Sequence, residues 1–352
     1  INMDNFKQRF IEDTNDILTG AWCQFRGMKF LKPGIHYLYR KNRVKVPLAE
    51  TNDASSNIGL SFELPDLWDF GSLYVEGDYQ QFRVGDNVRK GTAGYGTLDL
   101  FFGDTSVLVE GVYLDAFIQE GSVNQYGEYA RYNQPPTLDR IDQQSSPGED
   151  EWGTRVRIEQ SFLEGDFLLY VNGLLKHINP GASNEYEQYH GYAGTEYQYQ
   201  NGRSRVQVNG GYREENTIAP GREADIVEMK HGGYDYLQYL TKGYALNFSG
   251  LIEHRTLPDG QNIRGSQFVG IEKSSLGSLT FEFGIDTTDE SPGIRTTYYA
   301  GLLNIKATDW LQLRMVGGTQ RGGLKCVGGI CRIYPSFAGY RIEILGNHDL
   351  GG

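Results

Sequence analysis

Side chains alternate between apolar and polar along many segments of this chain, and this period of two constrains its fold more than any other feature. Residues 151–162 are typical, because Val156 and Ile158 fall on one face of an extended chain. Arg155 and Arg157 fall on the other face. Successive side chains of a β-strand point to opposite faces of the sheet, whereas a helix needs apolar residues three or four apart. The alternation therefore predicts an all-β protein whose strands have one apolar and one polar face.

The connections between these segments alternate in length along the chain. Short turns are expected at 103–104, 163–166, 200–203, 240–243, 274–278 and 307–310. Long polar loops are expected at 47–56, 84–90, 119–150, 178–187, 214–222, 256–263, 287–294 and 318–336. Sixteen strands, with 14 to 18 allowed, are expected at 35–46, 57–64, 71–83, 91–103, 105–118, 151–162, 166–177, 188–200, 203–213, 223–238, 243–255, 264–274, 278–286, 295–306, 310–317 and 337–346. Residues 19–31 are left open between a further strand, a plug and a tether.

A barrel that spans a membrane accounts for this pattern. Tilted strands of about 9–11 residues cross the hydrocarbon of a bilayer, and the sheet must close because lipid cannot pair free backbone groups. Outer-membrane barrels have short periplasmic turns and long outer loops. The chain has no run of about 18 apolar residues that could form a transmembrane helix. We expect a transmembrane antiparallel up-and-down β-barrel over residues 34–346. A periplasmic segment, tether or plug is expected at 1–33, and a tail at 347–352.

Composition favours a membrane protein and argues against a nucleic-acid partner. The chain has 45 acidic and 33 basic residues and a net charge of −12, whereas nucleic-acid binding needs clustered lysine and arginine. Tyrosine (24 residues) and tryptophan favour the boundary between water and hydrocarbon, and Trp68 and Trp310 fall at expected short turns. A soluble carbohydrate-binding β protein is the alternative interpretation of this composition. The alternation of loop lengths favours the barrel.

The polar face of the strands carries charges of both signs. Such charges are costly to bury unless they are paired or hydrated, and a barrel of this size has room inside for water or a plug. The expected lumen charges are Arg155, Arg157, Glu159, Glu196, Arg213, Glu253, Glu282, Asp286, Arg314, Arg341 and Glu343. They form either a structural ladder across the lumen or a filter that selects among ions and solutes.

Two of the three cysteines, Cys326 and Cys331, flank a Gly-Gly pair. With Gly328 and Gly329 at the tip of a two-residue hairpin, the cysteines form the first non-hydrogen-bonded pair beyond the turn. A disulfide can bridge that spacing, and we expect one to stabilise an exposed hairpin in an oxidising compartment. A structural zinc site needs about four ligands, and thiol oxidoreductases use Cys-x-x-Cys, so both are weaker alternatives. Cys23 has no assigned role.

The sequence contains no residue pattern that indicates catalysis or cofactor binding. The six histidines are scattered, and the motifs for covalent haem, phosphate-binding loops and zinc proteases are absent. We therefore predict that the protein is not an enzyme and has no catalytic residue, no metal ligand and no cofactor. Outer-membrane barrel enzymes act at the outer rim, so a rim site around His177, His190 or His254 is the weaker alternative.

The C-terminal segment "GGTQRGGLKCVGGICRIYPSFAGYRIEIL" resembles the ending of an uncharacterised family of Gram-negative outer-membrane barrels, best represented among Bacteroidota. Members of that family end in the hairpin Gln-Arg-x-Gly-(Ile/Leu)-x-Cys-Val-Gly-Gly-(Val/Ile)-Cys-Arg and a last strand. The hairpin matches residues 320–332. The stretch "YNQPPTLDR" at 132–140 is similar to another part of the family. The resemblance implies an outer-membrane barrel and no known activity.

These features predict a porin-like passive channel for small solutes or ions in the bacterial outer membrane, with an acidic lumen that tolerates cations. The alternative is a scaffold barrel whose lumen is filled by secretion components, surface lipoproteins or cytochromes. Outer-membrane lipid is the expected partner in both cases. Other outer-membrane or periplasmic proteins are partners of the scaffold, and nucleic acid is not expected.

Overall fold

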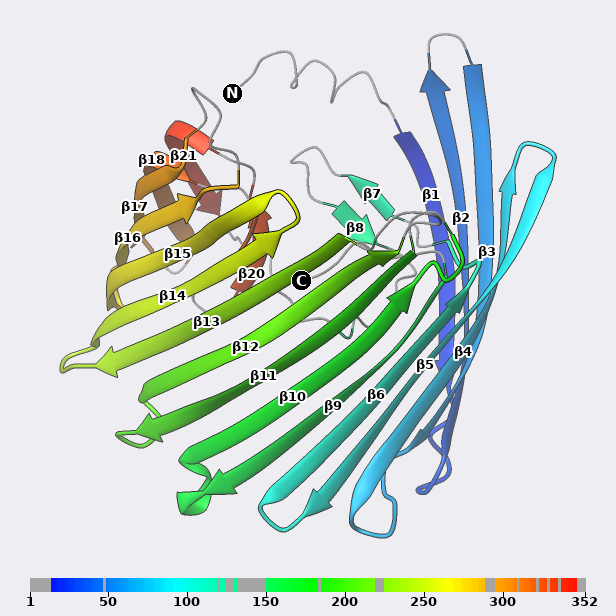
Figure 1. Ribbon diagram of the computed structural model, residues 1–352, viewed down its shortest axis with the longest axis horizontal. Coiled ribbons are helices and arrows are strands. Elements are labelled where there is room, and N and C mark those ends of the chain that lie inside the picture. The colour runs from blue at the N-terminus through cyan, green and yellow to red at the C-terminus, as the bar shows by residue number, and fades with distance from the viewer. Residues whose placement is uncertain are drawn as a thin grey trace. The chain divides into compact units, whose positions relative to one another are not determined.

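The computed structural model of the chain is all-β. It describes residues 14–46, 49–118, 121–123, 129–131, 138, 150–182, 185–218, 225–288, 295–308, 310–320, 323–327, 330–334 and 337–346. Seventeen strands form one antiparallel up-and-down sheet, and two strand pairs form separate two-stranded sheets (Figure 1). None of the helices among these residues is both long and apolar enough to cross a membrane.

All sixteen strands that the alternation predicts are present in the large sheet, together with a seventeenth strand. The strands of this sheet are β1 (Thr14–Gln24), β2 (Lys32–Val46), β3 (Ala49–Leu64), β4 (Gly71–Val84), β5 (Asn87–Phe102), β6 (Thr105–Asp115), β9 (Glu151–Phe162), β10 (Phe167–Ile178), β11 (Glu185–Tyr199), β12 (Ser204–Ile218), β13 (Asp225–Tyr239), β14 (Tyr244–Leu257), β15 (Gly260–Lys273), β16 (Gly277–Asp286), β17 (Thr297–Lys306), β18 (Leu311–Gln320) and β21 (Phe337–Gly346). The additional strand, β1, comes from the segment that the sequence left open between a strand, a plug and a tether. Closure of the sheet into a barrel stays a prediction.

Two short hairpins and one helical turn complete the described structure. The hairpin of β7 (Gly121–Val123) and β8 (Tyr129–Arg131) lies in the long connection between β6 and β9. The hairpin of β19 (Gly323–Val327) and β20 (Ile330–Tyr334) lies between β18 and β21. A single 3-10 turn, η1 (Leu163–Gly165), joins β9 to β10.

The predicted long loops at 47–56, 84–90 and 256–263 are wrong. At each of these places the two neighbouring strands stay paired until only two residues separate them. The last pairs are Val46 with Ala49, Val84 with Asn87 and Leu257 with Gly260. Polar residues fill these strand ends, and a polar side chain is compatible with strand pairing wherever its surroundings are wet. A prediction from polarity alone therefore makes these strands shorter than they are in the structure.

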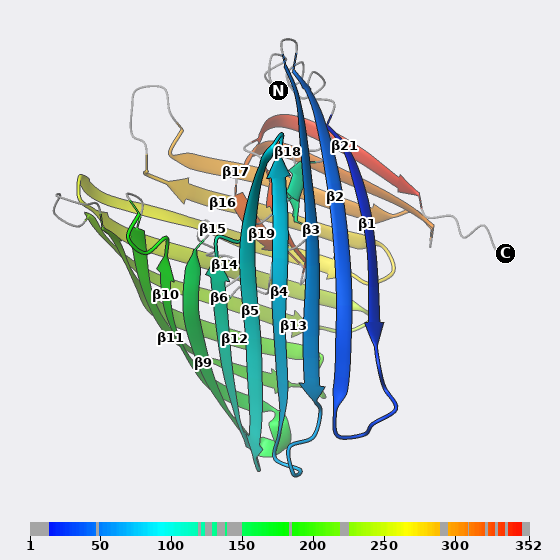
Figure 2. The same ribbon diagram turned by 90° about the vertical axis from the view of Figure 1, so that its right-hand side faces the viewer.

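The chain divides into two compact units. Unit 1 comprises residues 1–159, 172–189 and 215–224, and unit 2 comprises residues 160–171, 190–214 and 225–352. In unit 1 each strand from β1 to β6 pairs with the next, and β2, β3 and β4 run side by side (Figures 1 and 2). In unit 2 the strands from β13 to β18 pair in chain order, and β18 pairs with β21.

Burial of the two strand faces is the reverse of that in a water-soluble β protein. Phe281, in the middle of β16, is 59% exposed, whereas the next residue, Glu282, is 3% exposed. Ile252 and Glu253 of β14 show the same contrast, at 51% and 5%. Soluble proteins bury such apolar side chains because each contributes about 1.5–3 kcal/mol when it leaves water. The apolar face of these strands is therefore the more exposed one, and the charged face is the more buried one.

Exposed aromatic side chains lie at short turns, as the sequence predicts. Trp68, between β3 and β4, is 81% exposed and stacks on Phe70 with 6.1 Å between the ring centroids. Phe70 in turn stacks on Phe102 at 6.5 Å. Trp310, next to the start of β18, is also exposed. Rings of this kind gather where transmembrane strands leave the hydrocarbon for water.

Candidate functional site: the polar face of the sheet

All eleven charges that the sequence assigns to one face lie within strands of the large sheet. The structure brings several of them together in pairs across or along the strands. Arg157 Nη2 lies 2.5 Å from Glu159 Oε1, and Arg341 Nε lies 3.1 Å from Glu343 Oε1. Close pairing of opposite charges offsets part of the cost of taking them out of bulk water.

Three of the remaining predicted residues have different surroundings. Glu196 accepts a hydrogen bond of 2.8 Å from Gln198 Nε2. Arg314 Nη2 lies 3.5 Å from the side-chain oxygen of Gln312. Arg213 is buried. The assignment of these residues to a lumen, and their role in the passage of solutes, stay predictions.

A buried network in unit 1 is centred on Glu110 of β6. Arg155 of β9 forms an ion pair with Glu110 through its guanidinium group. Tyr95 of β5 donates its hydroxyl hydrogen to Glu110 Oε1 at 2.7 Å, and the ring of Tyr74 lies 6.3 Å from the ring of Tyr95. The side chains of Arg155 and Glu110 are only 19% and 8% exposed. This carboxylate is thus neutralised and hydrogen-bonded on a face that three strands share.

Leu138, from the expected long loop 119–150, packs against this same polar face and is 2% exposed. Its backbone oxygen accepts a hydrogen bond of 3.2 Å from Arg155 Nη1. The buried apolar residues that form one cluster with it are Ala93, Val112, Leu114, Phe117 and Leu174. Ala93 and Val112 lie two residues from Tyr95 and Glu110, so they share a face with the ion pair. The long loop therefore covers part of the polar face at Leu138; residues 132–137 and 139–149 lie outside the described part of the chain.

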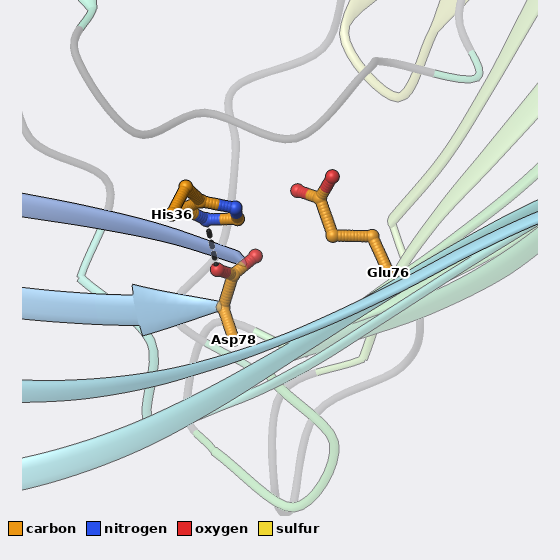
Figure 3. A group of neighbouring side chains, drawn as sticks. All are labelled: His36, Glu76 and Asp78. Atoms are coloured by element: carbon orange, nitrogen blue, oxygen red, sulfur yellow. Dashed lines mark hydrogen bonds and ion pairs between the residues drawn. The ribbon is translucent and has the colours of Figure 1, made fainter. Parts of the chain in front are cut away.

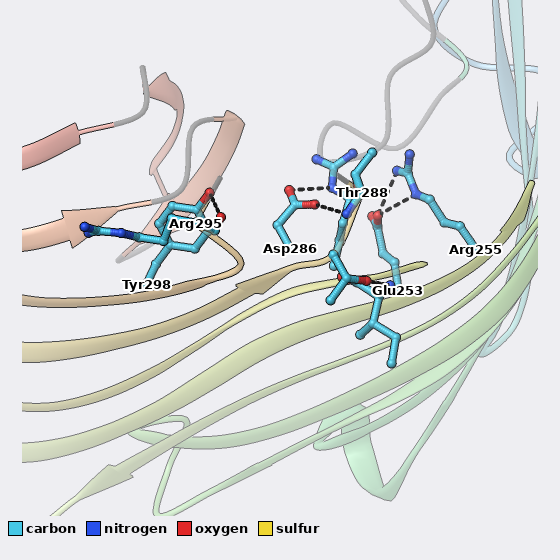
Figure 4. A network of polar contacts seen from close by, with 9 residues as sticks. Glu253, Arg255, Asp286, Thr288, Arg295 and Tyr298 are labelled. Atoms are coloured by element: carbon cyan, nitrogen blue, oxygen red, sulfur yellow. Dashed lines mark hydrogen bonds and ion pairs between the residues drawn. The ribbon is translucent and has the colours of Figure 1, made fainter. Parts of the chain in front are cut away.

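Charged and polar pairs also line the polar face of unit 2 (Figure 4). Glu253 Oε2 accepts hydrogen bonds from Arg255 Nη2 at 2.8 Å and from Arg255 Nε at 3.1 Å. Asp286 Oδ2 lies 3.5 Å from Arg264 Nε, and Asp286 Oδ1 accepts a hydrogen bond of 3.1 Å from the backbone of Thr288.

Glu282 of β16 accepts a hydrogen bond from an uncharged side chain. Its Oε2 atom accepts a hydrogen bond of 2.8 Å from Gln320 Nε2 of β18, and both side chains are buried. An amide partner satisfies an oxygen of the carboxylate without neutralising its charge.

Several histidines that are scattered in sequence have polar neighbours in the structure. His190 Nε2 lies 2.8 Å from His231 Nε2 in unit 2. In unit 1, His177 Nε2 lies 2.8 Å from Glu185 Oε1, and His36, Glu76 and Asp78 place ligand atoms close enough together to hold a metal ion. His36 lies 40 residues or more before Glu76 and Asp78 in the sequence, so the spacing of ligands along the chain does not indicate this last group. These three residues become neighbours only through the register of β2, β3 and β4, which the sequence does not mark.

The cysteine hairpin has the predicted backbone register. β19 and β20 pair Val327 with Ile330 and Cys326 with Cys331. Gly328 and Gly329, and the side chains of the two cysteines, lie outside what the structure describes, and the disulfide stays a prediction. Cys23 of β1 is a free, exposed cysteine.

A family model described as "Family of unknown function (DUF6029)" matches residues 282–348 of the chain. This stretch begins within β16 and contains β17, β18, the β19–β20 hairpin and β21. It covers less than half of the chain. A comparison with curated proteins finds no match. Over its C-terminal strands the chain is therefore similar to a family for which no activity is described.

Proposed function

We propose that the chain is a transmembrane β-barrel of the bacterial outer membrane that serves as a porin-like passive channel for small solutes or ions. The observation that carries the proposal is the inverted burial of the two faces: Phe281 and Ile252 point outward, while Glu282 and Glu253 are covered. Hydrocarbon solvates an apolar outer face, and a closed sheet leaves no unpaired backbone groups in lipid.

Energetics favour lipid over water on the outer face. Exposed large apolar side chains occur on strands of both units, among them Ile158, Val171, Val208 and Phe283. Monomeric soluble proteins rarely expose apolar patches larger than a few hundred Å². A soluble carbohydrate-binding β protein would bury this face and expose the charged one, so the observed burial supports the membrane interpretation better.

The polar face supports a hydrated lumen. Its charges are of both signs and largely paired, which is the arrangement expected where water and counter-charges share the solvation of buried ions. Glu282 is a buried carboxylate of this face, and Gln320 donates a hydrogen bond to it. Such a carboxylate favours the passage of cations through a pore.

Single-channel recording in planar lipid bilayers tests the channel. We expect the purified chain to give discrete conductance steps with a preference for cations. Glu282→Gln should reduce that preference, because it removes a lumen charge while keeping a hydrogen-bonding side chain of the same size. Glu164→Gln, in the exposed turn η1, is the matched control and should leave the preference unchanged. Bilayers that stay silent although folded protein has inserted would contradict the channel.

A scaffold barrel with a filled lumen is the second candidate, and one observation favours it. Leu138 brings a loop segment onto the polar face, where it is buried among apolar side chains. A lumen that is occupied by chain or by a partner protein conducts poorly. Silent bilayers, together with a partner that co-purifies from native membranes in stoichiometric amount, would select the scaffold over the channel.

A further inference from the structure

Three side chains on the polar face of unit 1 converge above a glycine. The register pairs His36 of β2 with Gly59 of β3, and Gly59 with Asp78 of β4. His36 and Asp78 therefore lie on either side of Gly59 on one face of the sheet. Glu76 precedes Asp78 by two residues on β4 and so points to the same face.

Figure 3 shows His36 and Asp78 joined by a polar contact, with Glu76 beside them. His36 Nε2 lies 2.7 Å from Asp78 Oδ1. One ligand atom from each of His36, Glu76 and Asp78 can be chosen so that all three lie within 4.8 Å of one another. The side chains of His36 and Asp78 are 23% and 14% exposed, so solvent can reach the group.

Gly59 makes this convergence possible. A Cβ atom at position 59 would lie inside normal contact distance of both the His36 ring and the Asp78 carboxylate. Gly77, the neighbouring glycine of β4, differs, because a Cβ there would meet only a backbone oxygen, that of Ala93, at 4.0 Å. Because Gly59 has no side chain, a gap remains above it, and any larger residue at this position would fill that gap.

The group has an excess of negative charge. Among the residues that the structure describes, no lysine or arginine forms an ion pair with Glu76 or Asp78. Glu76 accepts a hydrogen bond from the hydroxyl of Tyr74, which contributes no charge. Two neighbouring carboxylates repel each other, and a single imidazolium neutralises only one of them. A divalent cation would neutralise both.

We infer that His36, Glu76 and Asp78 form a binding site for a divalent transition-metal ion of the Zn²⁺ class. An imidazole nitrogen suits zinc, copper, iron and nickel, whereas Ca²⁺ and Mg²⁺ prefer ligand sets made of oxygen. Three protein ligands leave at least one position for water. This site goes beyond the proposed function, since it needs only three adjacent strands and does not depend on an open pore.

Small movements convert the observed arrangement into a metal site. Zinc bonds to histidine nitrogen and carboxylate oxygen measure about 2.0–2.2 Å, so the ligand atoms of a tetrahedral site lie about 3.3–3.5 Å apart. His36 Nε2 and Asp78 Oδ1 must separate from 2.7 Å, and the Glu76 carboxylate must approach. These are rotations of side chains above Gly59, where no Cβ blocks them.

Isothermal titration of the purified full-length chain in detergent tests the site, with Zn²⁺ as the probe after treatment with a chelator. We expect one Zn²⁺ per chain to bind, and at least 10-fold weaker binding in His36→Gln and Asp78→Asn. Gly59→Ala should weaken binding as well, because it fills the gap and leaves all three ligands in place. Co²⁺ added in place of zinc should give a visible absorption band that His36→Gln abolishes.

Two matched controls separate loss of ligands from loss of folding. His177→Gln removes another histidine that lies 2.8 Å from a carboxylate, and Gly77→Ala adds a methyl group where there is room. Both should bind Zn²⁺ as the unchanged chain does. Circular dichroism establishes that each variant is folded. No zinc binding by the unchanged chain, equal binding by His36→Gln, or equal competition by Mg²⁺ would each overturn the inference, whatever the conductance of the protein.

Discussion

Replacing Phe281 by arginine tests whether lipid covers the apolar face. Phe281 is the fifth of the ten residues of β16 and is 59% exposed. In the proposed barrel this places the side chain near the middle of the hydrocarbon. If the face meets water instead, an exposed phenylalanine can become arginine at little cost, since surface substitutions usually change stability by about 0.5 kcal/mol or less.

The expected loss of stability has two parts. Full burial of a phenylalanine contributes about 1.5–3 kcal/mol, so contact of the 59% exposed fraction with lipid contributes about 1–2 kcal/mol. An arginine at the bilayer midplane of an outer-membrane barrel costs about 2–4 kcal/mol. Phe281→Arg should therefore lower the free energy of unfolding by about 3–6 kcal/mol.

Ile305→Arg is the matched control. Ile305 of β17 lies on the same exposed face, but it pairs with Gly277 at the end of β16. Near the water boundary an arginine costs about 0–1 kcal/mol. Both free energies can be measured by urea titration of protein folded into lipid vesicles, followed by tryptophan fluorescence. Equal costs at the two positions, or a cost of Phe281→Arg below about 0.5 kcal/mol, would refute the assignment of the apolar face to lipid.

Two further predictions concern the buried ion pair and the cysteines. Glu110→Gln should lower the free energy of unfolding by about 3–5 kcal/mol, because it leaves Arg155 buried without its counter-charge, while Glu110→Gln combined with Arg155→Met should cost less than the single change. The same urea titration measures both, and a double variant less stable than Glu110→Gln would contradict this reasoning. If Cys326 and Cys331 are joined, the denatured chain should have one reactive thiol, that of Cys23, before reduction and three after it. Three reactive thiols before reduction would rule out the disulfide.

The sequence predicts the strands and their faces well, because both follow from local periodicity. The alternation in residues 151–162 assigns Arg155 and Arg157 to one face whatever strand lies beside them, and the structure agrees. The ends of strands are predicted less well. Residues 49–56 are polar and read as a loop, yet they continue β3 and pair with β2. A strand that extends beyond the apolar zone needs no apolar side chains, so composition does not mark its end.

The sequence did not predict which side chains become neighbours across strands. Glu110 meets Arg155 and His36 meets Asp78 because of register, which depends on where each hairpin turns. In the cysteine hairpin the Gly-Gly pair marks the turn, and the predicted pairing of Cys326 with Cys331 is confirmed for the backbone. The hairpin of β2 and β3 has no such mark, and the sequence predicts a loop of ten residues where only two residues separate the last pair of the strands.

The same apolar pattern that specifies the outer face also fixes this register. A slip of one residue between β2 and β3 would turn the exposed Ile58 and Leu60 inward and move Gly59 to the outer face. His36 and Asp78 would then lose the gap that lets them meet. If lipid covers the outer face, as proposed, such a slip is costly, since each inverted side chain would replace an apolar group by a polar one in hydrocarbon. The convergence of His36, Glu76 and Asp78 on the inner face is therefore held in place by the alternation on the outer one.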